Sequence, residues 1–241
     1  MSEAEAIQFR SDVTVELVKA AARDSDVIWA ARVSTRGESS LEDVDADPEK
    51  ARGLINYLMR DRHGTPFEHT SLTYFVSAPI FVFREFMRHR IASYNEESGR
   101  YRELRPVFYV PGPDRNLVQQ GKPGAYEFVP GTPEQHRVVV EQTEAACRQA
   151  YDAYQAMLDA GVAREVARIV LPVGTYSSMY VTMNARALMN FLSLRTKHPD
   201  SHFPSFPQRE IEMVADLMEA EWAALMPITH AAFADNGRVA P

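Results

Sequence analysis

The chain has 241 residues, of which 45% are hydrophobic and 24% are charged. This composition is typical of a globular protein with its own core and excludes a mainly disordered chain. The formal net charge of −7 does not favour binding to nucleic-acid polymers. A single cysteine, Cys147, excludes a disulfide framework and a multi-cysteine zinc site.

Three features predict a cytoplasmic protein without a membrane segment. Residues 1–10 lack the apolar core of a secretory signal. The longest uncharged run, from Ile169 to Ala185, contains Pro172 and Gly174 and is too short and too polar to span a bilayer. A lone cysteine also suits a reducing compartment.

Periodicity and capping signals predict a mixed succession of helices and a few strands. In the first half we expect a strand over residues 9–19, a helix from 24 to about 34 capped by Asp24-Ser25-Asp26, a loop over 35–46, a helix from 48 to about 60, a strand over 70–78 and a helix over 80–90. In the second half we expect a strand near 107–110, a surface excursion over 111–131, a long helix from Thr132-Pro133 to Gly161, a short helix over 163–171, a strand over 175–183, a helix over 184–195, a loop over 196–207 and a final helix over 208–225. Without a regular βαβ alternation, this order predicts one α+β domain over residues 1–241, with a mainly antiparallel sheet flanked by long helices.

Arginine is unusually common and unevenly distributed. The chain has 22 Arg and 4 Lys, and six arginines lie between Arg84 and Arg105. Codon bias in a GC-rich genome accounts for the excess but not for the clustering. Because arginine forms planar contacts with phosphate and carboxylate groups, the cluster suggests a small anionic ligand.

Several common site motifs are missing. Neither a G-x-G-x-x-G nor a P-loop sequence is present. His63, Glu68, His69 and His89 could be metal ligands, but their spacing matches no standard site, so we expect no metal. Cys147 lies within a predicted helix and is interpreted as a packed residue, not a nucleophile.

The segment from Arg88 to Tyr101, RHRIASYNEESGRY, carries the most chemical information. Cationic residues at the end of a helix complement its dipole, and this alone would explain Arg88-His89-Arg90. The polar residues that follow need another explanation. Ser98, Gly99 and Arg100 offer a hydroxyl, an approachable backbone and a guanidinium, which are phosphate-binding groups, and Asn95 and Glu96 can read a base or a sugar.

This segment resembles the flavin-dependent thymidylate synthases, whose signature is R-H-R, seven residues and then Ser, here Arg88-His89-Arg90 and Ser98. Further similarity lies in HGTPFEH, REVARIVLP, NARALMNFLSLR and AARVS. The resemblance implies a methyltransferase that makes dTMP from dUMP. It implies methylenetetrahydrofolate as the carbon donor and NADPH as the reductant of FAD, with no enzyme cysteine as nucleophile. It also implies a homotetramer with FAD in a cleft between subunits.

Family position implies two sets of site residues. The residues expected to bind FAD are Ser34, His63, Thr65, Arg88, His89, Arg90, Glu96, Asn184, Ala185, Arg186 and Asn190. The residues expected to bind dUMP are Glu85, Arg88, Glu96, Glu97, Ser98, Gly99, Arg100, Arg168 and Arg195.

Three of these positions have alternative interpretations or depart from the family. Arg195 follows the apolar stripe of its helix, so it either reaches solvent at the helix end or faces an anion; the resemblance implies that it stabilises the uracil imide as an anion and is catalytic. Arg168 could instead pair with Glu165 on the helix surface. The family often has Leu at position 97, so we expect Glu97 to contact the nucleotide through its backbone, with its carboxylate in solvent.

Two other functions remain open from the residues alone. One is a nucleotide-binding module without flavin and without catalysis, and the other is a histidine-based metallohydrolase. The roles of His198 and His202 in the loop over 196–207 are not indicated by the sequence, beyond solvated histidines.

Overall fold

The computed structural model describes residues 6–41, 47–122 and 125–241. The chain divides into two compact units. Unit 1 comprises Met1–Val13, Ser77–Glu85 and Glu96–Met179, and unit 2 comprises Thr14–Val76, Phe86–Asn95 and Tyr180–Pro241. The units are therefore not consecutive domains, because the chain passes between them several times. The single domain over residues 1–241 stays a prediction.

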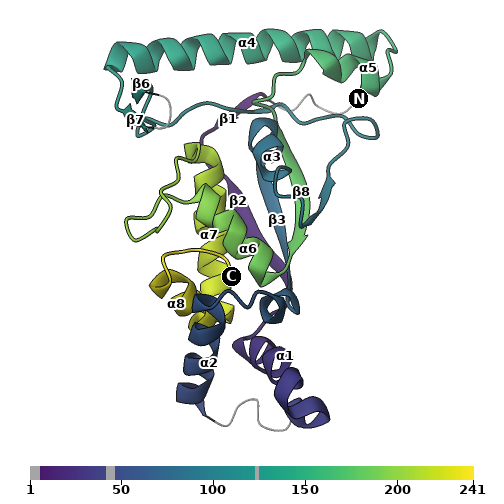
Figure 1. Ribbon diagram of the computed structural model, residues 1–241. Coiled ribbons are helices and arrows are strands. Elements are labelled where there is room, and N and C mark those ends of the chain that lie inside the picture. The colour runs from purple at the N-terminus through teal and green to yellow at the C-terminus, as the bar shows by residue number, and fades with distance from the viewer. Residues whose placement is uncertain (1–5, 42–46, 123–124) are drawn as a thin grey trace. The chain divides into compact units, whose positions relative to one another are not determined.

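Unit 2 contains strand β2 (Thr14–Ala21) and parts of β3 (Ser71–Pro79), β4 (Ser93–Glu96) and β8 (Tyr176–Met183). These strands form a sheet in the order β2-β3-β8-β4. The helices of this unit are α1 (Asp24–Arg36), α2 (Pro48–Arg60), α6 (Ala185–Arg195), α7 (Arg209–Leu225) and α8 (Pro227–Asp235), with the 3-10 turns η1 (Gly37–Leu41) and η2 (Thr65–Glu68). Helix α7 packs against β2, α6 and α8 (Figure 1).

Two of the helices of unit 2, α2 and α6, begin where side-chain caps predict. The Asp47 carboxylate accepts hydrogen bonds from the backbone N–H groups of Glu49 and Lys50 at the start of α2. Asn184 accepts from the N–H of Ala187 at the start of α6. Asp24 does not cap its own helix, because its carboxylate accepts from the backbone N–H groups of Ile228 and Thr229 in α8.

Four expectations for the chain ends and loops need correction. The strand expected over residues 9–19 is two strands, because β1 (Gln8–Arg10) pairs with a different partner from β2. Residues 35–41 of the expected loop finish α1 and form η1, while residues 42–46 lie outside the described residues. Helix α8 was not expected, because only Met226 separates it from α7. The excursion over 111–131 contains a hairpin of β6 (Val118–Lys122) and β7 (Ala125–Val129).

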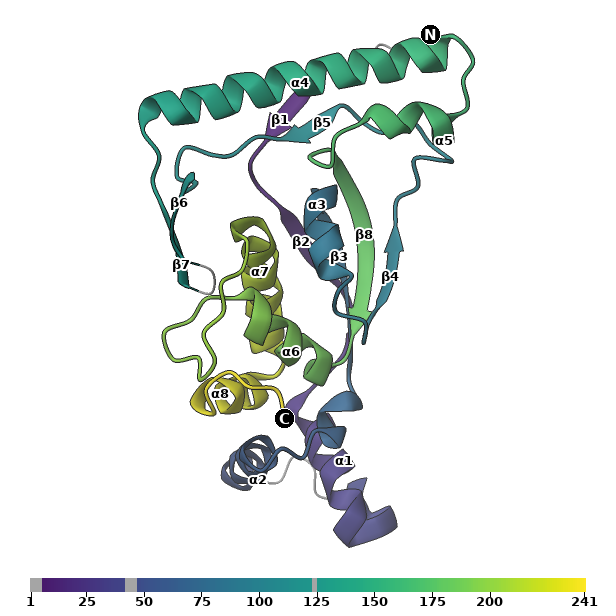
Figure 2. The same cartoon turned by 45° about the horizontal axis from the view of Figure 1, so that its top comes forward.

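Unit 1 is organised around the longest helix, α4 (Pro133–Asp159). Strand β1 pairs in parallel with β5 (Val107–Tyr109), with Phe9 opposite Phe108. Phe108 packs in one cluster with Tyr151 and Tyr154 of α4, and Figure 2 shows α4 running along this strand pair. The unit also contains the short elements α5 (Arg164–Ala167) and η3 (Arg168–Val170), and most of α3 (Ile80–Phe86). The α+β class is confirmed, although the β1–β5 pair is parallel.

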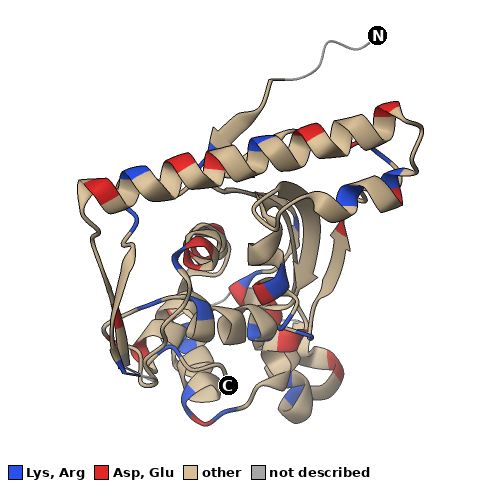
Figure 3. Ribbon diagram, turned by 90° about the horizontal axis from the view of Figure 1, so that it is seen from above, with Lys and Arg blue, Asp and Glu red and all other residues tan. Residues whose placement is uncertain are grey.

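The outer face of α4 carries both signs of charge (Figure 3). Arg137 forms ion pairs with Glu134 at 2.6 Å and Glu141 at 2.7 Å, all with well-exposed side chains. Solvent screens such exposed pairs, so they stabilise the helix only weakly. This face therefore lacks the continuous positive stripe of a nucleic-acid binder. No helix of the described residues is both long and apolar enough to cross a membrane.

Candidate active site

The Arg88-His89-Arg90 motif lies in a turn, which corrects the expected helix over residues 80–90. Helix α3 ends at Phe86, and the backbone N–H of His89 bonds to the carbonyl of Phe86 at 3.0 Å. The hydroxyl of Tyr94 lies 2.9 Å from the Phe86 carbonyl and 2.7 Å from the His89 carbonyl. Because the tyrosine offers a donor to carbonyls at the helix end, the chain can leave the helix there. Arg88 and Arg90 are exposed in this turn.

His89 meets the predicted catalytic arginine inside unit 2. The Nε–H of Arg195 donates a hydrogen bond to Nε2 of His89 at 3.0 Å. Burial, and then the charge of Arg195, lower the pKa of His89 to about 4. An arginine has donors only, so the imidazole accepts with Nε2 and carries its own proton on Nδ1. The pair is therefore a fixed cation with a neutral partner.

Aromatic packing holds this pair in place. The His89 ring lies edge-on to Phe191 of α6, with 4.9 Å between ring centroids. Phe191 stacks on Phe86 at 4.6 Å, and both are fully buried. Leu188 and Leu192 of the predicted apolar stripe are also fully buried, and Arg195 follows them as the last residue of α6. Arg195 is thus on the buried edge of its helix, as expected.

Arg186, at the other end of α6, is held within the fold. Its Nη1 donates to Glu68 at 2.5 Å and its Nε donates to the Pro241 carbonyl at 2.6 Å. A Cβ on Gly64 would lie 2.5 Å from the guanidinium carbon of Arg186, so glycine at this position lets the guanidinium approach the backbone closely. From the sequence, Glu68 was interpreted only as a possible metal ligand, and no motif predicted its ion pair with Arg186.

Asn184 and Ala185, two neighbours in the predicted FAD-binding set, already form hydrogen bonds within the protein. The backbone N–H of Ala185 donates to the hydroxyl of Thr70 at 2.8 Å, and the side-chain oxygen of Asn184 caps α6. Ser34, His63, Thr65 and Asn190 are exposed. The His63 ring packs at 5.5 Å from Tyr57. Apart from Glu96, all predicted cofactor residues belong to unit 2.

The predicted nucleotide residues gather in unit 1, apart from Arg88 and Arg195. After β4, the backbone turns at Ser98, whose carbonyl accepts from the N–H groups of Tyr101 and Arg102. Gly99 is buried in this turn, and a Cβ there would lie 2.9 Å from Leu104 and 3.2 Å from the Arg168 side chain. A larger residue at position 99 would therefore press on Leu104 and on the Arg168 side chain.

Glu97 departs from expectation. Its backbone N–H donates to the Ser178 carbonyl at 2.8 Å, so this N–H is used inside unit 1. Its side chain is only 12% exposed, and Oε1 lies 3.1 Å from Nε of Arg102. The expected solvent-facing carboxylate is therefore wrong, although the contact with Arg102 lacks the geometry of a hydrogen bond. The cation explains how a carboxylate is tolerated at this position.

The arginine pairing also differs from the simplest expectation. Glu165 pairs with Arg100 at 2.9 Å, both half-exposed, and not with Arg168. The positive charge of Arg168 instead acts on the carboxyl group of Glu96 and favours its ionised form. Burial raises the pKa of Glu96, while its hydrogen bond with Ser177 opposes this shift. Ser177 was not predicted, because a serine within a strand has no distinguishing sequence signal. Glu85 is half-buried.

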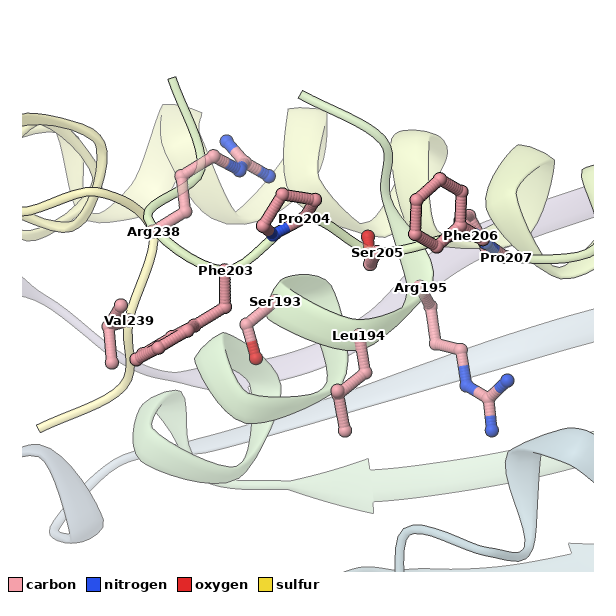
Figure 4. Close-up of a pocket in the computed structure, with 10 residues that line it drawn as sticks. All are labelled: Ser193, Leu194, Arg195, Phe203, Pro204, Ser205, Phe206, Pro207, Arg238 and Val239. Carbon is pink, nitrogen blue, oxygen red and sulfur yellow. The ribbon is translucent and has the colours of Figure 1, made fainter. Parts of the chain in front are cut away.

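A cavity of about 380 Å³ lies in unit 2 where α6 ends. It is lined by Ser193 to Arg195, Phe203 to Pro207, Arg238 and Val239 (Figure 4). The loop beside it is fixed to the C-terminal segment, because the N–H of His202 donates to the Gly237 carbonyl at 2.9 Å. His198 and His202 are both exposed. Across the described residues, no group of three or more His, Cys, Asp or Glu could hold a metal ion.

Comparisons with known proteins agree over nearly the whole chain. A family described as "Thymidylate synthase complementing protein" matches residues 16–228. The chain is 71% identical to a flavin-dependent thymidylate synthase of Streptomyces coelicolor, over 98% of this chain and 96% of that protein. It is 59% identical to the protein of that name from Tropheryma whipplei strain TW08/27, over 97% of each chain. A crystal structure of a UMP/dUMP methylase, PolB of Streptomyces cacaoi, bound with 5-Br dUMP, superposes with a TM-score of 0.93 at 57% identity, covering 98% of this chain and 100% of that one. The chain therefore belongs to the flavin-dependent thymidylate synthase family and is a methyltransferase enzyme.

Proposed function

We propose that the protein converts dUMP to dTMP, with methylenetetrahydrofolate as carbon donor and NADPH as the source of reducing equivalents through FAD. The observation that carries this proposal is the Arg195 guanidinium held by neutral His89 at the end of α6. A cation fixed in a half-buried place can stabilise negative charge that develops on a bound ring. The names of the relatives, and the 5-Br dUMP and 5-Br UMP bound to PolB, support a uridylate substrate.

In the proposed reaction Arg195 acts on the uracil imide. Negative charge spread over the ring makes a ring carbon nucleophilic, so that it can bond to the methylene carbon of methylenetetrahydrofolate without a cysteine adduct. The ring carbon then loses its proton and tetrahydrofolate leaves. Ser98, Gly99 and Arg100 would bind the phosphate, with Arg168 beside them. Glu85, Glu96, Glu97 and Arg88 complete the proposed nucleotide set. Folate and NADPH are proposed as co-substrates from the family resemblance.

The chemistry of the exposed groups in unit 2 fits FAD. Arg88 and Arg90 are exposed, so both cations are accessible to a diphosphate. Ser34, His63, Thr65, Asn184, Ala185, Arg186 and Asn190 would complete the FAD site, with His89 and Glu96. Arg186 adds hydrogen-bond donors more than net charge, because Glu68 balances it. When bound, FAD supplies the hydride that turns the methylene carbon into a methyl group. We further propose a homotetramer with FAD between subunits, and a cytoplasmic location, which the free thiol of Cys147 supports.

The purified protein should be yellow and should release FAD, not FMN, when it is denatured by heat. With NADPH, methylenetetrahydrofolate and dUMP it should form dTMP, and replacing dUMP by UMP asks whether the chain accepts the ribonucleotide. Release of FMN alone, or of no flavin, would contradict the FAD proposal. Tight dUMP binding without flavin or turnover would favour the nucleotide-binding module. Metal analysis of the same sample tests the metallohydrolase.

Replacing Cys147 by alanine should leave dTMP formation within about twofold of the parent. Cys147 is buried in α4 among Phe108, Tyr151 and Tyr154, and burial raises the pKa of its thiol, so the reactive thiolate is disfavoured. The substitution should cost only about 1 kcal/mol of stability. Turnover and flavin content at equal protein concentration provide the measurement. Lost turnover with flavin intact would show that the thiol takes part in the reaction.

A further inference from the structure

The contact between Arg195 and His89 suggests a task for His89 beyond cofactor binding. Nε2 of His89 accepts a hydrogen bond from the Nε–H of Arg195. Nε is the nitrogen that joins the guanidinium group to the aliphatic part of the side chain. A bond to Nε fixes the rotation of the guanidinium plane about the end of the side chain. Because an arginine recognises a planar group through paired donors, the orientation of its plane decides whether both donors are aligned.

The histidine is itself held from several sides. Its ring packs edge-on against Phe191, and Phe191 stacks on Phe86. Its backbone carbonyl lies 2.7 Å from the hydroxyl of Tyr94. The acceptor atom is therefore preorganised by a buried aromatic group and by the turn after α3, and little ordering remains when a ligand binds.

We propose that His89 is a positioning residue, whose Nε2 lone pair sets the plane of the Arg195 guanidinium toward the uracil ring. The inference rests on the proposed function, in which Arg195 faces the imide. It limits how His89 can meet a cofactor. With Nε2 engaged by Arg195, only the Nδ1–H and the ring faces remain for contact with FAD.

Two variants separate the acceptor from the ring. His89→Phe keeps an aromatic ring but removes the acceptor, whereas His89→Gln places a carbonyl oxygen near the position of Nε2. A hydrogen bond to a charged group is worth enough that we expect kcat to fall about ten- to a hundredfold in His89→Phe. His89→Gln should recover most of this loss. The KM for dUMP should change by less than about threefold, and kcat is expressed per bound flavin so that any loss of FAD is measured separately.

A double-variant cycle makes the coupling specific. In the Arg195→Ala background, His89→Phe should cost less than about threefold, because the group that it positions is gone. Equal losses in both backgrounds would overturn the proposal. So would a loss of flavin in proportion to the loss of activity, which would make His89 a cofactor contact only.

A measurement without turnover keeps the inference separate from the proposed reaction. Protein labelled with ¹⁵N-histidine should show His89, assigned by comparison with His89→Gln, as the neutral Nδ1–H tautomer from pH 5 to 8. A proton on Nε2 would overturn the positioning role even if dTMP is formed. If the tautomer is as expected and no dTMP forms, the proposed function fails while the Arg195–His89 contact stands.

Discussion

Replacing Arg195 by alanine should reduce dTMP formation about a hundred- to a thousandfold, while flavin content and visible spectrum are unchanged. The magnitude is that of removing one fixed donor from developing negative charge. The guanidinium is partly buried, and in such surroundings a charge acts more strongly than in water. The loss should fall on kcat, since the interaction strengthens as the ring acquires charge. Single-turnover and steady-state rates with saturating dUMP provide the measurement.

Lysine should not restore the lost rate. An ammonium is a point charge without the planar donor set, and its geometry does not reproduce the Nε–H that bonds to His89. Arg137→Ala is the matched control, because it removes an exposed guanidinium from α4 and should leave the rate unchanged. If Arg195→Ala turns over within a few-fold of the parent, Arg195 does not stabilise the imide anion.

Replacing Glu219 by glutamine should lower the free energy of unfolding by about 3 to 5 kcal/mol at neutral pH. Glu219 of α7 bonds to both terminal nitrogens of Arg238, at 2.7 and 2.6 Å, and to His230 at 2.9 Å. The Arg238 side chain is only 4% exposed, so the variant leaves a buried cation without its carboxylate. Arg238 also bonds to the hydroxyl of Thr196, directly after Arg195. Urea unfolding at fixed protein concentration measures the change.

The loss of stability in Glu219→Gln should be largest at neutral pH and smaller in acid. Burial alone would raise the pKa of Glu219, but the hydrogen bonds from His230 and Arg238 and their charges lower it from 4.5 to about 2. A carboxylate with a lowered pKa in the folded state stabilises the protein fully above pH 4.5, and this contribution disappears as the pH falls toward 2. The shift corresponds to roughly 3 kcal/mol. The difference between parent and variant should therefore shrink over this range of pH.

Glu141→Gln serves as the control for the loss of one ion-paired carboxylate. Glu141 pairs with Arg137 at 2.7 Å with half-exposed side chains, so its removal should lower the free energy of unfolding far less than Glu219→Gln does. Equal and small losses in Glu141→Gln and Glu219→Gln would contradict the role given to the buried pair. A loss for Glu219→Gln that persists unchanged at pH 2 would contradict the lowered pKa.

Local signals in the sequence determined most elements correctly, because capping and periodicity act over three or four residues. Asp47-Pro48 and Asn184 mark the starts of α2 and α6, as predicted. Predictions failed where a distant partner intervenes. Tyr94 binds carbonyls at the end of α3 and shortens the expected helix. Asp24 binds the backbone of α8, which the sequence did not indicate.

For the site, the sequence by itself determined the residue types and the family through the spacing of Arg88-His89-Arg90 and Ser98. Only the tertiary structure decided their partners. His89 and Arg195 are 106 positions apart, yet one accepts a hydrogen bond from the other. Glu165 pairs with Arg100 although Arg168 is nearer in sequence. The physical reason is that a hydrogen bond or an ion pair depends on distance and direction in space, and sequence spacing sets these only within a single helix or turn.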